Sequence, residues 1–244
     1  MTRFFVSPEE MISDHVILSG ENATHAKVLR LKPGENILIC DGQGNECICS
    51  VVDLSDGKLK VNVLKRQNSS SEAAIKASVY VAFPKSDKLE HVIQKATELG
   101  AYEIVTFPSS RCIAKLTDKD KVKKLERWQK IAASAAEQSG RGRIPDVIIL
   151  SSYKDALRHA VDSSDKAILF YENETAVTLH MALENKSFSS ISLITGPEGG
   201  LDPAEITIAK EKGVEICTLG KRILRCETAP LCALSAVMYA TGEF

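Results

Sequence analysis

The sequence predicts an α/β protein in which a small β-rich domain precedes a larger domain built on a mostly parallel sheet. Three observations carry this prediction: short strand-like runs with frequent turn signals near the N-terminus, a polar stretch from Lys65 to Ala74, and alternating strand and helix patterns after it. The 244 residues suffice for two unequal domains. With 44% apolar and 26% charged residues, the composition is that of a globular chain, not of a disordered or fibrous one.

Composition also excludes several protein classes. Lys and Arg number 31 against 32 Asp and Glu, so any contact with nucleic acid must come from local patches. No apolar run reaches the roughly 18 residues of a membrane helix, and the first residues lack a secretory-signal pattern. Seven Cys without a CxxC motif indicate free thiols in a reducing cytoplasm. Cys47 and Cys49 have no partner at metal-ligand spacing, so no metal site is expected.

The first part of the chain reads as a small barrel or sandwich. Strands are expected at residues 36–40, 46–53 and 59–64, with a tight turn at Asp56-Gly57 and a helix near 22–29. The stretch Lys65–Ala74 has three successive Ser, both charges and no apolar periodicity, which favours a linker. We therefore place the domains at 1–72 and 73–244.

The second part alternates strands and helices. A helix should begin at Asp87, with Glu90 completing a capping box, and a long helix should bury Trp128 and its neighbours on one face. Strands are expected at residues 77–83, 103–107, 147–150, 167–171, 191–195 and 214–218. Parallel sheets bind ligands at the carboxyl ends of their strands, so the loops after Tyr171, Thr195 and Thr218 are the candidate sites.

The loop after Thr195 reads Gly196-Pro-Glu-Gly-Gly200 and leads into a capping box formed by Asp202 and Glu205. It is neither the dinucleotide fingerprint GxGxxG nor a phosphate-binding loop. Its glycines allow close approach to a ligand, and its acidic residue suits a positively charged one. An ordinary tight turn is the alternative.

Two further segments carry reactive side chains. Leu219–Pro230 contains Arg225 and Glu227 before a helix, where a helix cap and a surface arginine are the simpler interpretation. The end of the long helix, Ala132–Pro145, gathers Glu137, Gln138, Arg141 and Arg143, which equally fit a solvated helix terminus.

In this order and at these positions, several segments together match one family. They are Arg3-Phe-Phe5, His25-Ala-Lys-Val-Leu-Arg30, Asp41-Gly-Gln-Gly44, Lys95-Ala-Thr-Glu-Leu-Gly100, Ala136-Glu-Gln-Ser139, Gly196-Pro-Glu-Gly-Gly200 and Leu219-Gly-Lys-Arg-Ile-Leu-Arg-Cys-Glu-Thr-Ala229. Over nearly its whole length, the chain resembles the small-subunit ribosomal RNA uracil-N3 methyltransferase family (RsmE) of the SPOUT class. It departs visibly at Cys226, where Thr is expected.

The resemblance implies a SPOUT-type parallel sheet with a deep trefoil knot over 73–244 and an RNA-binding PUA-like β-barrel over 1–72. It implies a homodimeric, cytoplasmic enzyme that uses S-adenosyl-L-methionine to methylate N3 of a uracil in 16S ribosomal RNA within the small ribosomal subunit. The cofactor-binding residues it implies are Thr195, Gly196, Glu198, Gly199, Gly200, Leu219, Gly220, Ile223, Leu224, Thr228 and Ala229.

Residue roles follow from that chemistry. Arg225 is the leading candidate for binding the target and stabilising charge on the uracil oxygens as N3 loses its proton. Glu137 or Glu227 would be the base, or would orient the loop, and Glu198 would compensate the sulfonium charge or shape the backbone. The residues expected to contact RNA are Arg3, His25, Arg30, Lys32, Arg111, Gln138, Arg141 and Arg143.

Three alternatives stay open at this stage. A SPOUT enzyme acting on another RNA or atom would share these motifs. A non-catalytic RNA-binding or assembly factor would bind RNA independently of cofactor, and the intact segments at Gly196–Gly200 and Leu219–Ala229 argue against it. A nicotinamide-dependent enzyme lacks the glycine fingerprint after its first strand.

Overall fold

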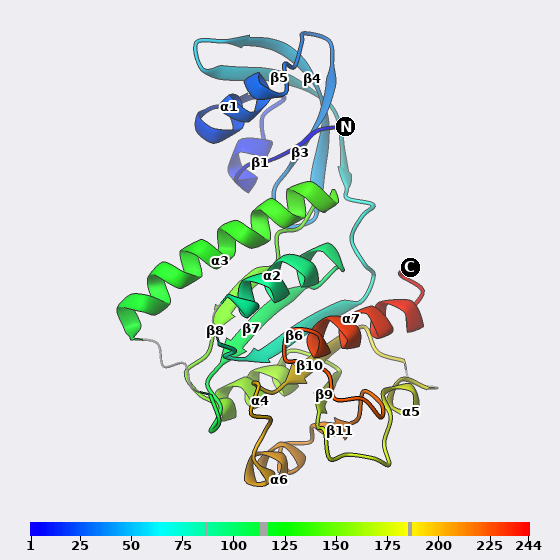
Figure 1. The fold of residues 1–244 in the computed structure, drawn as a ribbon. Helices are drawn as coiled ribbons and strands as arrows, with labels where there is room; N and C mark the ends of the chain where they lie inside the picture. Colours follow the sequence, from blue (N-terminus) through cyan, green and yellow to red (C-terminus); the bar gives the residue numbers. More distant parts are fainter. Residues whose placement is uncertain (86, 113–116, 185–186) are drawn as a thin grey trace. The chain divides into compact units, whose positions relative to one another are not determined.

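The computed structural model describes residues 1–85, 87–112, 117–184 and 187–244, and its internal contacts divide the chain into two units (Figure 1). The smaller unit comprises Met1–Glu72 together with Ala136–Ile144. The larger unit comprises Ala73–Ala135 and Pro145–Phe244. The chain therefore passes between the units three times, because the end of the long helix and its exit belong to the smaller unit.

The smaller unit is a curled five-stranded sheet with one α-helix. Its elements are β1 (Arg3–Phe5), the 3-10 helix η1 (Pro8–Met11), β2 (His15–Leu18), α1 (Gly20–Val28), β3 (Asn36–Cys40), β4 (Asn45–Ser55) and β5 (Lys58–Asn68). The strand order is β1-β3-β4-β5-β2; β1 and β3 are parallel and the other pairs antiparallel. Apolar side chains from every strand form its core: Phe4, Met11, Val16, Leu18, Ile37, Ile39, Val51, Leu59 and Val61.

The turn between β4 and β5 forms where the sequence predicts it. Asp56 (φ 51°) and Gly57 (φ 68°) both adopt the left-handed conformation that a two-residue hairpin turn requires. The linker prediction is wrong at its start, because β5 continues to Asn68 and pairs Lys65 with Ile48. The side chains of these last strand residues are mostly exposed, so they leave no apolar alternation to read.

The larger unit is built on a six-stranded, entirely parallel sheet. Its elements are β6 (Lys76–Ala82), α2 (Lys88–Glu98), β7 (Glu103–Phe107), α3 (Asp118–Ser139), β8 (Asp146–Ile149), α4 (Tyr153–Asp162), β9 (Lys166–Phe170), α5 (Leu179–Leu183), β10 (Ser190–Thr195), α6 (Pro203–Glu211), β11 (Glu215–Cys217) and α7 (Ala229–Ala240). The order β11-β9-β10-β6-β7-β8 makes β9 and β10 neighbours and puts β11 at the edge.

Helices cover both faces of this sheet, as expected for a parallel sheet (Figure 1). α7 packs against α2, β6 and β10, although it follows the edge strand β11 in the sequence. α4 and α6 share a core with the sheet through Leu157, Ile206, Leu169, Ile194 and Val105. The segment between β11 and α7 therefore runs from the sheet edge back toward the centre, beside the loops that follow β9 and β10. The knot that this segment is expected to thread stays a prediction.

The two capping boxes predicted for this unit have different outcomes. Asp202 and Glu205 form one at the start of α6, as predicted. The one predicted at α2 is wrong, since the Asp87 side chain makes no cap and Glu90 instead pairs with Arg127 at 2.7 Å. Across the described ranges, no helix combines the length and apolarity that crossing a membrane requires.

Candidate active site

A pocket of about 450 Å³ opens in the larger unit where β9, β10 and β11 end. The loops after these strands supply most of its wall because the strands are neighbours in the sheet. Its lining residues are Lys88, Phe170, Tyr171, Glu172, Thr195, Gly196, Pro197, Glu198, Gly199, Gly200, Leu201, Thr218, Leu219, Gly220, Lys221, Arg222, Ile223, Leu224, Arg225, Cys226 and Ala229.

The loop after β10 is held in a tight turn. The Gly200 N–H donates to the Pro197 carbonyl at 2.9 Å, and Gly200 has φ +67°. A Cβ there would meet only the end of the exposed Glu172 side chain, which can move away, so it is the left-handed backbone that favours glycine at this position. Arg111 anchors the outer side of the loop by donating to the Gly199 carbonyl and to Asp202.

The loop after β11 leads directly into α7. The Gly220 N–H donates to Thr218 Oγ1 at 3.2 Å, and Gly220 has φ +105° with open space where a Cβ would project. The Arg225 carbonyl accepts the N–H groups of Thr228 and Ala229, both at 2.9 Å, which starts the helix. This leaves the Arg225 side chain exposed and Ile223 85% exposed beside the pocket.

Lys88, at the start of α2, joins these two loops. Its Nζ lies 3.1 Å from Glu198 Oε1 and 3.2 Å from Glu227 Oε2. It also approaches Cys226 Sγ at 3.6 Å, and Cys226 Sγ lies 3.2 Å from Glu227 Oε2. We call Lys88, Glu198, Cys226 and Glu227 the Lys88 clamp. From the sequence, Glu198 is expected to compensate the sulfonium charge or to shape the backbone. In the structure, this carboxylate already pairs with the Lys88 ammonium.

The clamp also lowers the basicity of its carboxylates. Burial alone raises the pKa of Glu198, but hydrogen bonds from the Lys85 N–H, its own N–H and Lys88 outweigh burial and hold the pKa below its usual value. The pKa of Glu227 is lowered mainly by its own backbone N–H, with help from Cys226 and Lys88. A carboxylate with a lowered pKa is a weaker base, which disfavours Glu227 as the proton acceptor.

The third catalytic candidate, Glu137, belongs to the smaller unit. Its Oε1 lies 2.9 Å from His25 Nδ1, and the His25 ring packs edge-on against Phe4. The structure therefore joins two residues that the sequence interpretation put in different roles, a base and an RNA contact. Gln138, next in the helix, is exposed.

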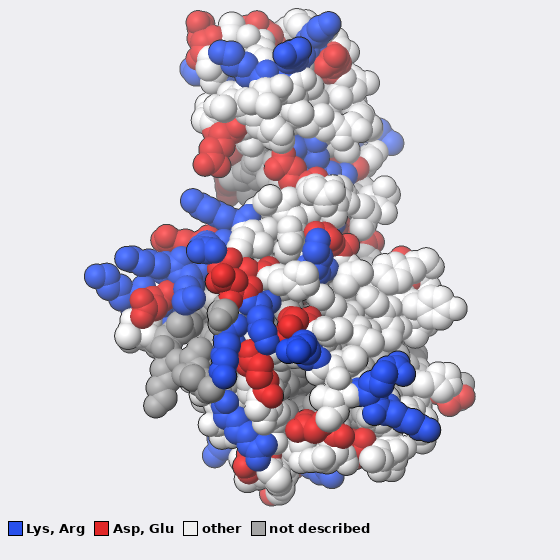
Figure 2. Space-filling view, in the orientation of Figure 1, with Lys and Arg blue, Asp and Glu red and all other residues white. Residues whose placement is uncertain are grey.

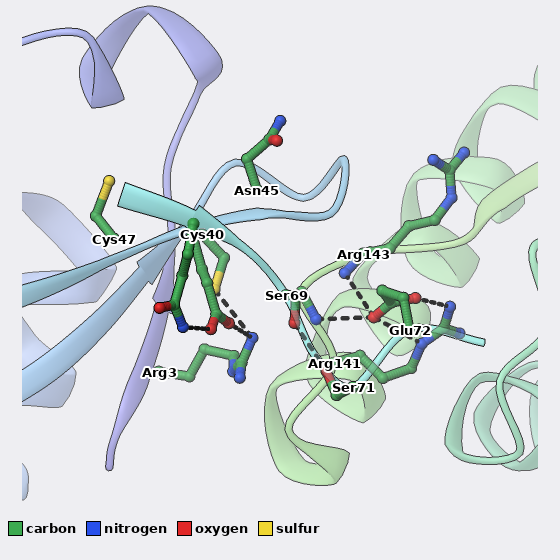
Figure 3. A network of polar contacts seen from close by, with 12 residues as sticks. Arg3, Cys40, Asn45, Cys47, Ser69, Ser71, Glu72, Arg141 and Arg143 are labelled. Carbon is green, nitrogen blue, oxygen red and sulfur yellow. Dashed lines mark hydrogen bonds and ion pairs between the residues drawn. The ribbon is translucent and has the colours of Figure 1, made fainter. Parts of the chain in front are cut away.

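Two arginines expected to contact RNA are buried in ion pairs instead (Figure 3). Arg3 Nη1 lies 3.0 Å from Glu46 Oε2, and only 10% of its side chain is exposed. Arg141 Nη2 lies 2.7 Å from Glu72 Oε2, and 5% of its side chain is exposed. A phosphate would have to displace the carboxylate that each arginine already pairs with, so the structure disfavours these two as phosphate contacts.

Glu72 also accepts the backbone N–H groups of Gly142 at 2.9 Å and Arg143 at 3.1 Å. We call these contacts, with the Arg141 pair, the Glu72 network. Figure 3 shows the Arg143 side chain extending away from Glu72 while its backbone donates to it. Ser69 packs so close to Gly142 that a Cβ on Gly142 would collide with its side chain. The network thus holds the segment that follows α3 against the segment that follows β5.

The other expected RNA contacts are more accessible. Arg30 and Lys32 are exposed after α1, and Arg30 has φ +57°, a conformation uncommon for a residue with a side chain. Arg143 is half-buried, and Arg111 pairs with Asp202 at 3.2 Å while 43% of its side chain stays exposed. On the face shown in Figure 2, Lys and Arg are interspersed with Asp and Glu.

Sequence reasoning missed several residues at the pocket. Lys88 cannot be recognised from the sequence because its partners are far away in the chain and no local pattern marks it. Glu172 lies in the loop after Tyr171, which the sequence singles out by its position and not by this residue. Lys221 and Arg222 stand in the quoted Leu219–Ala229 segment and are exposed at the pocket. The signal for these two was the density of cations in that segment.

Comparison with known proteins identifies the family. A family model described as RNA methyltransferase domain matches residues 71–238, and one described as RNA methyltransferase PUA domain matches residues 18–64. The ribosomal RNA small subunit methyltransferase E of Bacillus subtilis is 38% identical over 99% of this chain and 97% of its own length. The chain belongs to the ribosomal RNA small subunit methyltransferase E family.

Two further proteins of the same name support this assignment. The Mycobacterium tuberculosis protein is 33% identical over 93% of this chain and 87% of its own length. The crystal structure of the Neisseria gonorrhoeae methyltransferase E, bound to S-adenosyl methionine, superposes with a TM-score of 0.86 at 32% identity, covering 98% of this chain and 97% of that one. The α/β architecture with a parallel sheet and an N-terminal PUA domain is thus that of the methyltransferase E family.

Proposed function

We propose that this protein is an S-adenosyl-L-methionine-dependent methyltransferase that methylates N3 of a specific uracil in 16S ribosomal RNA. The observation that carries the proposal is the pocket at the ends of β9, β10 and β11, whose walls are the two segments, Gly196–Gly200 and Leu219–Ala229, that resemble this family. The B. subtilis relative named for small-subunit ribosomal RNA supports the choice of substrate.

The pocket suits the proposed cofactor. A volume of about 450 Å³ lies within the range of small-molecule sites. Backbone groups of glycine-rich loops line it, and at Gly220 the space a side chain would fill is open. When bound, S-adenosyl-L-methionine supplies an electrophilic methyl group. The residues proposed to hold it are Thr195, Gly196, Gly199, Gly200, Leu219, Gly220, Ile223, Leu224 and Ala229, with Thr228 at the helix start.

Methylation at N3 requires the loss of an imide proton, and negative charge then develops on the uracil oxygens. Arg225 is exposed at the pocket and carries a fixed positive charge, so we propose that it binds the uracil and stabilises that charge. Glu137 and Glu227 stay proposals for the base. The lowered pKa of Glu227 favours the alternative that it orients its loop through Lys88.

RNA recognition is proposed to rest on exposed cations around loops. These are Lys221, Arg222 and Arg225 at the pocket, Arg111 beside it, and Arg30 and Lys32 in the smaller unit, to which the half-buried Arg143 and His25 and the exposed Gln138 are added. The target base must be unpaired or flipped out for N3 to be reached. The role of 1–72 in RNA binding and the substrate in its small-subunit context belong to the same proposal.

The proposal includes a cytoplasmic homodimer, as the family resemblance implies. The larger unit exposes large apolar side chains that are available to a second copy, among them Tyr239 at 77%, Phe244 at 69% and Ile223 at 85%. Light scattering during gel filtration should give twice the 26.6 kDa chain mass.

The function is tested by methyl transfer to small subunits from cells that lack this activity. Purified protein with S-adenosyl-L-methionine should produce N3-methyluridine, detected by mass spectrometry of the nucleosides. Absence of transfer, with cofactor binding demonstrated by calorimetry, would contradict the proposal. A methyl group found on another base or atom would replace the substrate and keep the reaction class.

A further inference from the structure

Lys88 lines the pocket but neither binds the uracil nor carries the proton transfer in the proposed function. Lys88 is the first residue of α2, and its side chain, which lines the pocket, is 29% exposed. The strand before it, β6, is the neighbour of β10, which brings the start of α2 beside the loop that follows β10. Lys88 therefore comes from a third segment, separate from the two loops it contacts.

The ammonium group has three hydrogens, and the structure offers three acceptors. Two are the carboxylates of Glu198 and Glu227, and the third is Cys226 Sγ. The Cys226 thiol in turn faces Glu227 Oε2 at 3.2 Å. Burial raises the pKa of this thiol to about 12, so it stays protonated and donates to the carboxylate. The one departure from the family pattern, Cys226, is thus integrated into the clamp.

These contacts bind the two cofactor-pocket loops to each other. Glu198 belongs to the loop after β10 and Glu227 to the loop after β11, and neither contact is made within a loop. The Lys85 N–H adds a second bond from the α2 side to Glu198 Oε1, at 3.0 Å. Removal of the ammonium would leave two partly buried carboxylates facing each other, which repel.

The clamp contributes a local negative charge beside the pocket. Its one ammonium and two carboxylates sum to −1, whereas the other charged lining residues are Glu172, Lys221, Arg222 and Arg225. The product of methyl transfer, S-adenosylhomocysteine, is a neutral thioether of nearly the same shape as the cationic sulfonium donor. Electrostatic interaction with the wall therefore distinguishes the two, whereas packing treats them alike.

We propose that Lys88 is a positioning residue that fastens the loops after β10 and β11 around the cofactor and limits the preference of the pocket for the charged donor over the neutral product. The proposal rests on the proposed function, since it takes S-adenosyl-L-methionine as the ligand. Without Lys88 both ligands bind more weakly because the loops separate, and the remaining affinity shifts toward the cation.

The test is calorimetric titration of purified protein with S-adenosyl-L-methionine and with S-adenosylhomocysteine. Lys88→Met should weaken both by about tenfold, and the ratio of the two dissociation constants should shift at least about threefold toward the cationic donor. Lys88→Arg should keep both dissociation constants at their wild-type values, because a guanidinium also bridges two carboxylates. Lys95→Met is the matched control: this lysine pairs with Glu98 at 2.7 Å on the same helix, and the ligand affinities should not change.

Glu227→Gln gives the opposite sign. It removes one negative charge while keeping the pair between Lys88 and Glu198, so the ratio should shift toward the neutral product. A purely structural role would weaken both ligands equally in both variants, and that result would overturn the proposal, as would wild-type affinities in Lys88→Met. If circular dichroism shows that Lys88→Met does not fold, the affinities of Lys88→Arg and Glu227→Gln for the two ligands test the proposal in its place. Wild-type protein that binds neither ligand would overturn the proposed function and this inference together.

Discussion

The Glu72 network of the smaller unit and the Lys88 clamp of the larger unit use the same interaction with the charges reversed. In the first, one carboxylate gathers an arginine and two backbone N–H groups from the exit of α3. In the second, one ammonium gathers two carboxylates from different loops. Arg141 is 5% exposed, whereas the carboxylate side chains of the Lys88 clamp are 26% and 23% exposed, and Glu198 lines the pocket.

This difference in exposure indicates that the Glu72 network stabilises the fold, whereas the Lys88 clamp acts on the pocket. Loss of Glu72 removes the carboxylate that pairs with the buried Arg141 guanidinium, so its cost should appear as a lower free energy of unfolding. Loss of a partner in the Lys88 clamp leaves groups that water reaches in part, so its cost should appear mainly in ligand binding. Four measurements test this division between stability and ligand binding.

The largest expected effect lies at the pocket. Arg225→Ala should lower the methyl-transfer rate by roughly 100- to 1000-fold, because it removes the positive charge proposed to meet the developing anion. Cofactor affinity and melting temperature should stay at wild-type values. Arg222→Ala, a second exposed cation on the same loop, is the control and should lower RNA affinity only. Equal losses of rate in both variants would show that Arg225 has no special role.

The next effect lies in the smaller unit. Glu72→Ala should reduce the free energy of unfolding by about 2–3 kcal/mol, since it leaves Arg141 charged and nearly buried. Urea unfolding followed by circular dichroism measures it. The double variant with Arg141→Met should be destabilised by less than the sum of the two single variants. Additive losses would refute the coupling.

The pH dependence of the Lys88 clamp is expected to be smaller. Glu198 and Glu227 have pKa values below their usual 4.5, so their contribution is complete above about pH 4.5 and is lost as pH falls through the folded-state values. The raised pKa of Lys88, caused by Glu198 and then Glu227, makes its contribution complete below about pH 10.5. The difference in melting temperature between wild type and Lys88→Met should be constant between these limits and shrink in acid. A difference that grows in acid would contradict this.

The smallest effect concerns an exposed RNA contact. Lys32→Ala should weaken RNA binding a few-fold and reduce the salt dependence of binding by about one counterion. Lys212→Ala, an exposed lysine after α6, is the control. Filter binding at several salt concentrations distinguishes them, and an unchanged slope for Lys32→Ala would exclude it from the interface.

Much of the fold was readable from local pattern. β7 (Glu103–Phe107) appears with the predicted bounds, and the other strands predicted after the linker lie within a residue or so of their predicted ends. Continuous apolar runs and the Asp202–Glu205 capping box are local signals that tertiary structure did not override. β1 and β2 were missed because three or four residues are too short a run to establish alternation.

The parallel sheet, the loops at its carboxyl edge and the family can be predicted from local sequence, because the signal for each lies in runs of contiguous residues. Which charged residues are available to a ligand depends on the tertiary structure. Arg3 and Arg141 are buried against Glu46 and Glu72, and Lys88 reaches loops that follow two later strands. Burial and ion pairing depend on partners more than 40 positions away in the chain, and no local periodicity records such partners.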